Sequence, residues 1–324
     1  MAKLQVPAAG GFIEHDHNHD GIDRRGFLKC MAWAGTGALC LMEGGVLKSF
    51  ALGSKQHSAA RAELAFVQIS DSNMGFNKPA NPDVVATLQA AVDKINALPQ
   101  APEFLLHTGD ITHLSRPEQF DAVDQILRAA GKEIFFVPGE HDVLDDNGAL
   151  FRERYAPHAK GDGWYSFDKN GTHFIALVNV MNLKAGGLGA LGAEQLEWLK
   201  DDVHHLKSST PLVVFAHIPL WSIYPQWGWG TDDSAQALSF LKRFGSVTVL
   251  NGHIHQTMQK VEGNVTFHTA FSTAFPQPAP GDGAGPGPMK VPAEQLRSVL
   301  GITDVNYVQG RHALALVDSA LDEK

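Results

Sequence analysis

Between residues 63 and 139, short apolar runs alternate with longer amphipathic segments. Three continuous apolar runs have the length of strands and are typical of strands buried on both faces, at residues 63–70, 103–109 and 133–139. Two segments with helical spacing of apolar positions separate them, at residues 82–98 and 116–131. The alternating order of strands and helices predicts an α/β fold, with a parallel sheet and helices on its faces.

The second half of the chain continues this pattern with a hairpin first. Residues 163–179 predict two strands joined by a tight turn, because Asn170-Gly171 is a strong turn signal. Further strands are predicted at residues 211–217, 246–253, 263–270 and 312–319. Helices are predicted at residues 192–206 and 234–245. Residues 275–292 are rich in proline and glycine and predict a long loop.

The N-terminal segment has a different pattern. Arg24 and Arg25 are followed by Phe27, Leu28 and Lys29, and then by an apolar run at residues 30–42. This run is 13 residues long, whereas a helix needs about 20 to span a bilayer. The pattern resembles a twin-arginine export signal, with an ordinary N-terminal helix as the alternative.

That resemblance implies a leader at residues 1–56 and a single folded domain at residues 57–324. It also implies the twin-arginine translocase as a partner, a periplasmic or otherwise exported location, and no stable membrane span in the mature form. We expect cleavage near residues 51–53. The histidines of residues 15–20 either bind a metal or are incidental to a soluble leader.

Composition excludes some classes of protein. The formal net charge of −9 argues against a partner with a nucleic-acid backbone, which requires a basic face. Cys30 and Cys40 are the only cysteines, and both lie in the predicted leader. Without that leader, the chain can form neither a disulfide framework nor a thiolate metal site.

Carboxylates, amides and imidazoles recur where predicted strands end. They are Asp71, Asn73, Asp110, Glu140, His141, Asp142, His217, His253 and His255. The carboxyl edge of an open α/β sheet is where sites form, so we expect these side chains to meet there. Carboxylates and imidazoles without sulfur suit Mn, Fe, Zn or Mg. The glycines before Asp110, Glu140 and His253 permit sharp turns that aim these side chains.

Such a set of ligands suits the hydrolysis of phosphate esters, which are anionic and resist attack by water. Two metal ions about 3.5–4 Å apart can activate water and neutralise charge on the phosphoryl oxygens. A nearby histidine can protonate the departing oxygen. A small phosphate ester is therefore the predicted substrate.

The ordered blocks D-x-N, GD, GEHD, H and GHIH resemble those of the calcineurin-like metallophosphoesterase superfamily, over residues 64–270. The family pattern is D-x-H, GD, GNH-D/E, H and GH-x-H. The resemblance implies a four-layer α/β/β/α sandwich, two divalent metal ions and hydrolysis of a phosphate mono- or diester by metal-activated water. It implies one metal held by Asp71, Asp110 and His255, and the other by Asp110, Glu140, His217 and His253. It further implies His141 as general acid or phosphate-contacting residue, with Asp142 orienting it.

Two positions depart from the family pattern. Asn73 stands where the family has histidine, and its amide oxygen is a weaker ligand for a borderline metal. Glu140 stands where the family has asparagine and adds a negative charge. We expect the first metal to be held more weakly than the second, unless His107 or the better placed His113 fills the gap. Asn73 also leaves open an alternative function, a metal-binding scaffold of an exported complex with little or no activity.

Aromatic residues are concentrated in the loop after His217, as Trp221, Tyr224, Trp227 and Trp229. These rings either stack on a nucleobase or an aromatic leaving group, or form a packed lid or a partner surface. The loop at residues 275–292 could also border the site, but it contains no residue with evident chemistry.

Overall fold

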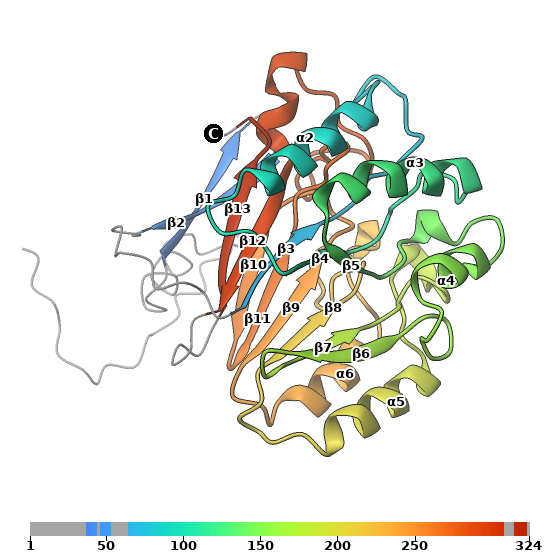
Figure 1. Cartoon of the computed structure of the whole chain (residues 1–324), viewed down its shortest axis with the longest axis vertical. Coiled ribbons are helices and arrows are strands. Elements are labelled where there is room, and N and C mark those ends of the chain that lie inside the picture. Colours follow the sequence, from blue (N-terminus) through green and yellow to red (C-terminus); the bar gives the residue numbers. More distant parts are fainter. Residues whose placement is uncertain (1–36, 44–45, 53–63, 308–313, 323–324) are drawn as a thin grey trace, which may run out of the picture.

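The computed structural model describes residues 37–43, 46–52, 64–307 and 314–322. Two sheets pack face to face, and helices cover the outer face of each (Figure 1). One sheet has the strand order β13-β12-β3-β4-β5, and the other has the order β10-β11-β9-β8-β7-β6. The predicted four-layer α/β/β/α sandwich is therefore confirmed.

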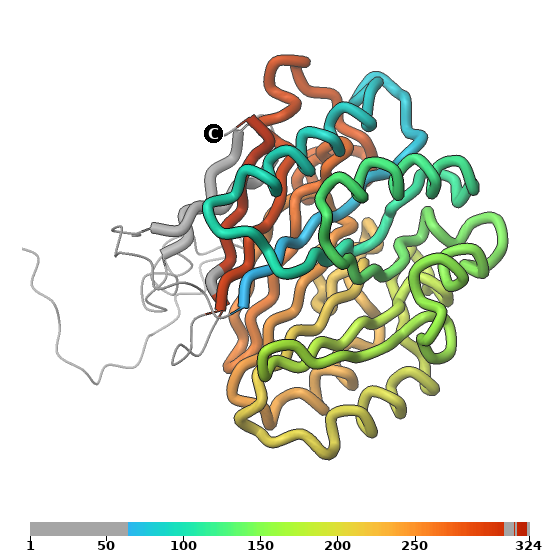
Figure 2. Tube along the Cα trace, viewed as in Figure 1, coloured from blue at the N-terminus to red at the C-terminus, as the bar shows by residue number. Residues whose placement is uncertain are grey.

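The first sheet is built mainly from the N-terminal part of this region. Its parallel strands are β3 (Leu64–Ile69), β4 (Phe104–His107) and β5 (Glu133–Phe136). Helices α2 (Val84–Asn96) and α3 (Pro117–Leu127) connect these strands. The antiparallel strands β12 (Gly301–Tyr307) and β13 (Ala315–Ala320) complete the sheet. Figure 2 shows the red C-terminal strands beside the blue strand β3, so the last part of the chain closes the sheet that the first part begins.

The second sheet comes from the middle of the chain. Its strands are β6 (Tyr165–Lys169), β7 (Thr172–Ala176), β8 (Leu212–Phe215), β9 (Val247–Asn251), β10 (Gln259–Glu262) and β11 (Val265–Thr269). Helices α5 (Ala193–His204) and α6 (Ser234–Leu241) cover it. The predicted turn joins β6 to β7, with Asn170 at φ 47° and Gly171 at φ 76°. Strands β7, β8, β9 and β11 run parallel, so their carboxyl ends share one edge.

Both faces of the central strands are buried, which explains their continuous apolar sequences. In β3, Val67 and Ile69 belong to the core under α2, whereas Leu64 and Phe66 lie in the core between the sheets. Phe66 stacks there on Phe104 of β4, with ring centroids 5.0 Å apart. Burial of each such side chain stabilises the fold by about 1.5–3 kcal/mol.

Some elements escape sequence reasoning. The seven-residue helix α4 (Ala149–Tyr155) is too short for a clear helical period. Strand β10 is exposed along its whole length and therefore lacks apolar alternation. Strand β12 has the polar residues Thr303 and Asp304 at its centre, so its sequence lacks the continuous apolar run that would predict a buried strand. As predicted, residues 275–292 contain neither helix nor strand, and a 3₁₀-helix, Ala293–Val299, follows them.

An antiparallel hairpin that the sequence did not predict precedes the sandwich, formed by β1 (Gly37–Glu43) and β2 (Val46–Leu52). The twin arginines and the histidines of residues 15–20 lie outside the described residues, so the structure does not test the export signal. Within the described part of the chain, no helix has both the length and the apolar character needed to cross a bilayer.

His173, on β7, links the β6–β7 hairpin to helix α5 through its two ring nitrogens. Its Nδ1 lies 2.8 Å from Asp168 Oδ1 on β6, and its Nε2 lies 2.9 Å from Asp202 Oδ2 on α5. Burial lowers the pKa of His173, but the hydrogen bonds and charges of Asp202 and Asp168 outweigh it, so the pKa is raised above its ordinary value. Protonated His173 therefore stabilises the fold below the unfolded-state pKa of about 6.5, and this stability is lost as the pH rises through the raised folded-state pKa.

We expect His173→Gln to lower the free energy of unfolding by about 1–2 kcal/mol at pH 6, and by less at alkaline pH. Urea denaturation at the two pH values measures the difference. His204→Gln is the control, because it makes the same substitution at an exposed histidine of helix α5, away from the two aspartates. Equal losses at both pH values would contradict a role for the charged imidazole.

Candidate metal centre

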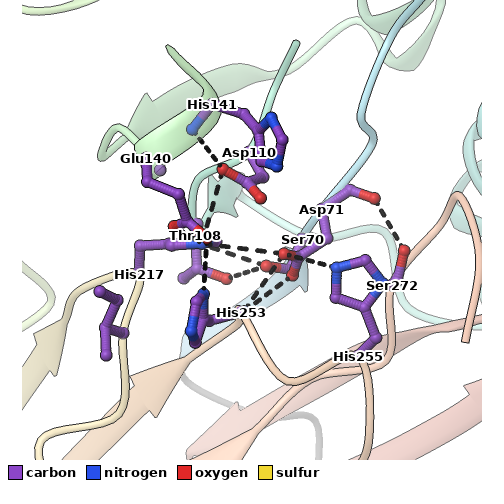
Figure 3. Close-up of polar contacts among 12 residues, drawn as sticks. Ser70, Asp71, Thr108, Asp110, Glu140, His141, His217, His253, His255 and Ser272 are labelled. Carbon is purple, nitrogen blue, oxygen red and sulfur yellow. Dashed lines mark hydrogen bonds and ion pairs between the residues drawn. The ribbon is translucent and has the colours of Figure 1, made fainter. Parts of the chain in front are cut away.

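Most of the predicted ligands meet at one rim, where the carboxyl ends of the strands of both sheets lie side by side (Figure 3). Asp71, Asp110 and Glu140 follow β3, β4 and β5 of the first sheet. His217 follows β8, and His253 and His255 follow β9, both in the second sheet. The strand ends of two layers thus bring together residues that are up to 184 positions apart in the chain.

His217 stands at the centre of this group. Its Nε2 lies 2.9 Å from Glu140 Oε2, 3.6 Å from Asp110 Oδ1 and 3.9 Å from Asp71 Oδ1. On one side, Glu140 Oε1 lies 3.0 Å from His253 Nδ1. On the other side, Asp71 Oδ1 lies 3.2 Å from His255 Nε2. The ligand atoms therefore divide into a Glu140 side and an Asp71 side that share His217 and Asp110.

These atoms fit divalent metal ions. His217 Nε2 and Glu140 Oε2 approach each other closely, yet neither is in a hydrogen bond of acceptable geometry, and both are buried. Buried polar atoms without a partner are costly, and two converging lone pairs are what a shared cation requires. Among the described residues there are three groups within which all ligand atoms lie within 4.8 Å of one another: Glu140, His217 and His253; Asp71, Asp110 and His217; and Asp110, Glu140 and His141.

Backbone carbonyls hold two of the imidazoles in the orientation that ligation needs. His217 Nδ1 donates to the carbonyl of Thr108 at 2.7 Å, and His255 Nδ1 donates to that of Phe275 at 2.5 Å. With Nδ1 protonated in this way, each ring presents a bare Nε2 to the centre. Gln277 donates to the carbonyl of His253 at 3.0 Å. The start of the loop at residues 275–292 thus borders and supports the site, through a main-chain carbonyl and the Gln277 amide.

The ligand-bearing loops have an unusual backbone. Five predicted ligands lie in the left-handed region, with φ between 41° and 70°: Asp71, Asn73, Asp110, His253 and His255. Such conformations cost on the order of 1–3 kcal/mol each in residues other than glycine, and they persist where the surrounding structure enforces them. Main-chain hydrogen bonds do so here, because Asp71 N donates to Gly109 O and Asn73 N donates to Asp110 O.

The glycines before the ligands act partly through turns and partly through lack of bulk. Gly109 has a φ of +93°, which agrees with the predicted sharp turn. Gly139 and Gly252 do not lie in the left-handed region, so the turn explanation is wrong for them. A Cβ at Gly139 would lie 2.1 Å from Asp110 Oδ1, and one at Gly252 would lie 2.5 Å from Asp71 Oδ2. Glycine is required at both positions because neighbouring loops come so close.

Buried negative charge is concentrated at the centre. Burial and the charge of Glu140 raise the pKa of Asp110 to about 7. Burial also opposes ionisation of Glu140, but the charges of His253 and His217 outweigh it and hold the pKa of Glu140 well below its usual range. The pKa of His217 is raised, because Asp110 and Glu140 outweigh the effect of burial. Buried carboxylates this close together repel each other unless a proton or a cation neutralises part of their charge. They are therefore suitable ligands for a cation.

His141 is held by a neighbour other than the one we predicted. Its Nδ1 donates to the carbonyl of His113 at 2.8 Å, and its ring stacks on that of His113 with centroids 4.9 Å apart. The prediction that Asp142 orients the His141 ring is wrong. Both oxygens of Asp142 are occupied by the main-chain amides of Gly139, Ile111 and Thr112 and by the Thr112 hydroxyl. Asp142 therefore fastens the loop, and the loop positions His141.

The family described as calcineurin-like phosphoesterase matches residues 64–257 of the chain. This range covers more than half of the sequence and includes every predicted site residue. The chain belongs to the calcineurin-like phosphoesterase family. It is accordingly a phosphoric ester hydrolase.

Relatives within the family act on different esters. A 3′,5′-cyclic-nucleotide phosphodiesterase of Nostoc sp. is 23% identical over 218 residues, which cover 65% of this chain and 79% of that protein. The serine/threonine-protein phosphatase CPPED1 of Mus musculus is 27% identical over 191 residues, which cover 53% of this chain and 61% of that protein. A dimetal phosphatase structure from Danio rerio has a TM-score of 0.61 at 15% identity, covering 81% of this chain and 98% of that one. This last likeness supports the fold.

The first departure from the calcineurin-like pattern, Asn73, is buried, and neither its Oδ1 nor its Nδ2 has a partner. Neither histidine that we considered as a replacement belongs to any of the three groups of ligand atoms among the described residues. His107 Nε2 contacts Ser72 Oγ at 3.0 Å, and burial lowers the pKa of His107 to about 3. His113 stacks on His141 instead. Both imidazoles therefore make other contacts in this structure.

The aromatic loop of this calcineurin-like domain packs largely on itself. Trp229 is fully buried, and its ring centroid lies 5.2 Å from that of Trp227, which in turn lies 5.2 Å from that of Tyr224. Trp221 packs 5.1 Å from Phe267 of β11. These contacts favour the packed-lid alternative over direct stacking on a nucleobase.

We expect Asp142→Asn to lower the free energy of unfolding by about 2–4 kcal/mol, because an amide group would face buried N–H donors. Chemical denaturation of metal-free protein measures this loss. Asp145→Asn, an exposed substitution in the same loop, should change stability by less than about 0.5 kcal/mol. Indistinguishable stabilities for the two variants would refute the loop-fastening role.

Proposed function

We propose that the protein hydrolyses a phosphate mono- or diester at a centre of two divalent metal ions drawn from Mn, Fe, Zn and Mg. The observation that supports this most directly is the sharing of Asp110 and His217 between adjacent groups of converging ligand atoms. A single ion does not need two carboxylate–imidazole groups joined in this way. The Asp71 side and the Glu140 side would each hold one ion.

The bound ions would supply an activated water and neutralise charge on the phosphoryl oxygens. The residues of the chain orient the ligands and position the proton donor. Thr108 O and Phe275 O keep the bare nitrogens of His217 and His255 aimed at the centre. His113 O holds the proton of His141 on Nδ1, so Nε2 is the nitrogen that exchanges a proton with the departing oxygen.

We expect turnover of aryl phosphate monoesters, diesters or both in the presence of Mn²⁺, with metal bound. His141→Gln should lower kcat by about 10²–10⁴-fold and leave metal content unchanged, because His141 acts on the leaving group. His205→Gln, an exposed histidine just after α5, is the control. Metal binding by the unaltered protein without turnover on any ester would favour the alternative of a metal-binding scaffold. If the unaltered protein neither binds metal nor hydrolyses an ester, the proposal is refuted.

We also propose that the twin-arginine translocase exports the protein already folded, to the periplasm or an equivalent compartment. The support lies in Arg24, Arg25, Phe27, Leu28 and Lys29, which stand before a short apolar run. A site assembled from residues so far apart in the chain is compatible with this route, because the fold and its metals can form before transport.

Replacing Arg24 and Arg25 together with lysine should retain the protein in the cytoplasm, because the paired arginines are the feature that identifies the signal. Cell fractionation with immunoblotting measures the distribution. The same double replacement at Arg116 and Arg128, two exposed arginines of the folded domain, should leave export unchanged. Normal export of the Arg24/Arg25 variant would exclude this pathway.

A further inference from the structure

The two sides of the centre differ in the chemistry of their ligands. On the Glu140 side, one carboxylate contacts two imidazoles, those of His217 and His253, at 2.9 and 3.0 Å (Figure 3). On the Asp71 side, His255 contacts the Asp71 carboxylate at 3.2 Å, and the shared His217 Nε2 lies farther away, 3.9 Å from Asp71 Oδ1. Because one imidazole nitrogen ligates one ion and His217 lies nearer to Glu140, the Glu140 side has more nitrogen, and nitrogen content governs which divalent ion a site prefers.

Asn73 increases this difference. It lies two residues after Asp71, and its main-chain N donates to Asp110 O at 2.8 Å, so its backbone is fixed between two carboxylate-bearing loops. Its side chain is 1% exposed, and both of its polar atoms are unpartnered. An amide oxygen is a neutral, hard ligand, whereas the imidazole it replaces would be neutral and borderline. With Asn73 as a ligand, the Asp71 side would be rich in oxygen.

Among the described residues, neither His107 nor His113 belongs to a group of converging ligand atoms. The Nε2 of His107 is occupied by Ser72 Oγ, and its ring stacks on Phe136 with centroids 5.8 Å apart. The ring of His113 lies between Phe76, at 5.3 Å, and His141, at 4.9 Å. Each ring keeps a buried Nδ1 without a hydrogen-bond partner, but its aromatic contacts fix the orientation of the ring.

Glu140 has the opposite effect on its own side. A carboxylate with one methylene more than aspartate reaches between two histidines and places one oxygen against each. Its side chain is 25% exposed, so it loses part of its hydration, and a cation would recover that loss. The Glu140 side therefore combines extra negative charge with two borderline nitrogens, which favours tight binding of zinc.

We propose that the centre takes up two different ions in a fixed order. The Glu140–His217–His253 side binds Zn²⁺ first and tightly, and the Asp71–Asn73–His255 side then binds a harder ion, Mn²⁺ or Mg²⁺, weakly enough to exchange. The second ion would thus report the supply of such ions around the protein. This inference rests on the proposed two-metal centre and adds the order, the identity and the relative affinity of the ions.

Direct metal binding tests this proposal without any substrate. Full-length protein is stripped with a chelator and titrated with Zn²⁺ and then with Mn²⁺ by calorimetry. Bound metal is counted by mass spectrometry after gel filtration, and bound Mn²⁺ is followed by electron paramagnetic resonance. We expect one retained equivalent of Zn²⁺, and a Mn²⁺ site that is at least about 10-fold weaker and empties on gel filtration.

Asn73→His should convert the weak site into one that retains a second equivalent of Zn²⁺, with affinity raised by at least about 10-fold. Asn77→His is the matched control, because it makes the same substitution at an exposed position of the same loop and should leave both affinities unchanged. The titration of the unaltered protein needs no variant to fold, so the prediction can fail on that result alone.

The outcomes separate two failures. Two equivalents of Zn²⁺ retained with equal affinity by the unaltered protein would overturn the ordered, mixed-metal inference and leave the proposed phosphoesterase function standing. No effect of Asn73→His on the weak site would also overturn the inference, since Asn73 would then not be a ligand. Failure to bind either ion would overturn both this inference and the two-metal function beneath it.

Discussion

The convergence of buried lone pairs on His217 Nε2 is the constraint on which the rest of this structure depends. Glu140, Asp110 and Asp71 all direct carboxylate oxygens within 3.9 Å of this nitrogen. Burial, and then the charge of neighbouring carboxylates, raises the affinity of such groups for protons, as the pKa of about 7 at Asp110 shows. Bringing these groups together costs the fold stability but suits a cation site. The surrounding backbone conformations and close loop contacts hold the groups together despite this cost.

The backbone conformation of the ligand-bearing loops helps to hold these groups together. Left-handed conformations at Asp71, Asp110 and His253 let residues at the ends of strands turn their side chains back over the sheet rim. Glycines at positions 139 and 252 let the loops approach within a distance that any Cβ would forbid. Strain and close approach of this kind survive only because the layers beneath are rigid and fully packed, with aromatic stacking between the two sheets.

The family pattern and its departures then divide the work among neighbouring residues. In the GEHD turn, Glu140 faces the two histidines, His141 offers its Nε2, and Asp142 binds main-chain amides. Under the proposed function, these three adjacent residues would serve a metal, a proton and a loop. On the other side of the centre, the unpartnered amide of Asn73 would make the two proposed metal positions chemically unequal.

The sequence by itself indicated the alternating strands and helices and the residues of the centre, and its resemblance to the family indicated the four layers. Continuous apolar runs such as β3 require two buried faces, and acid and imidazole residues at strand ends require a common rim.

Which atom faces which neighbour was decided only by the tertiary structure. The three imidazoles donate to the main-chain carbonyls of Thr108, Phe275 and His113. Every residue has such a carbonyl, so no sequence pattern identifies these acceptors. The task of Asp142 was mistaken for the same reason, because its partners are main-chain amides brought near by folding. Local composition selects elements and chemistry, whereas orientation follows from long-range packing that no single stretch of the chain contains.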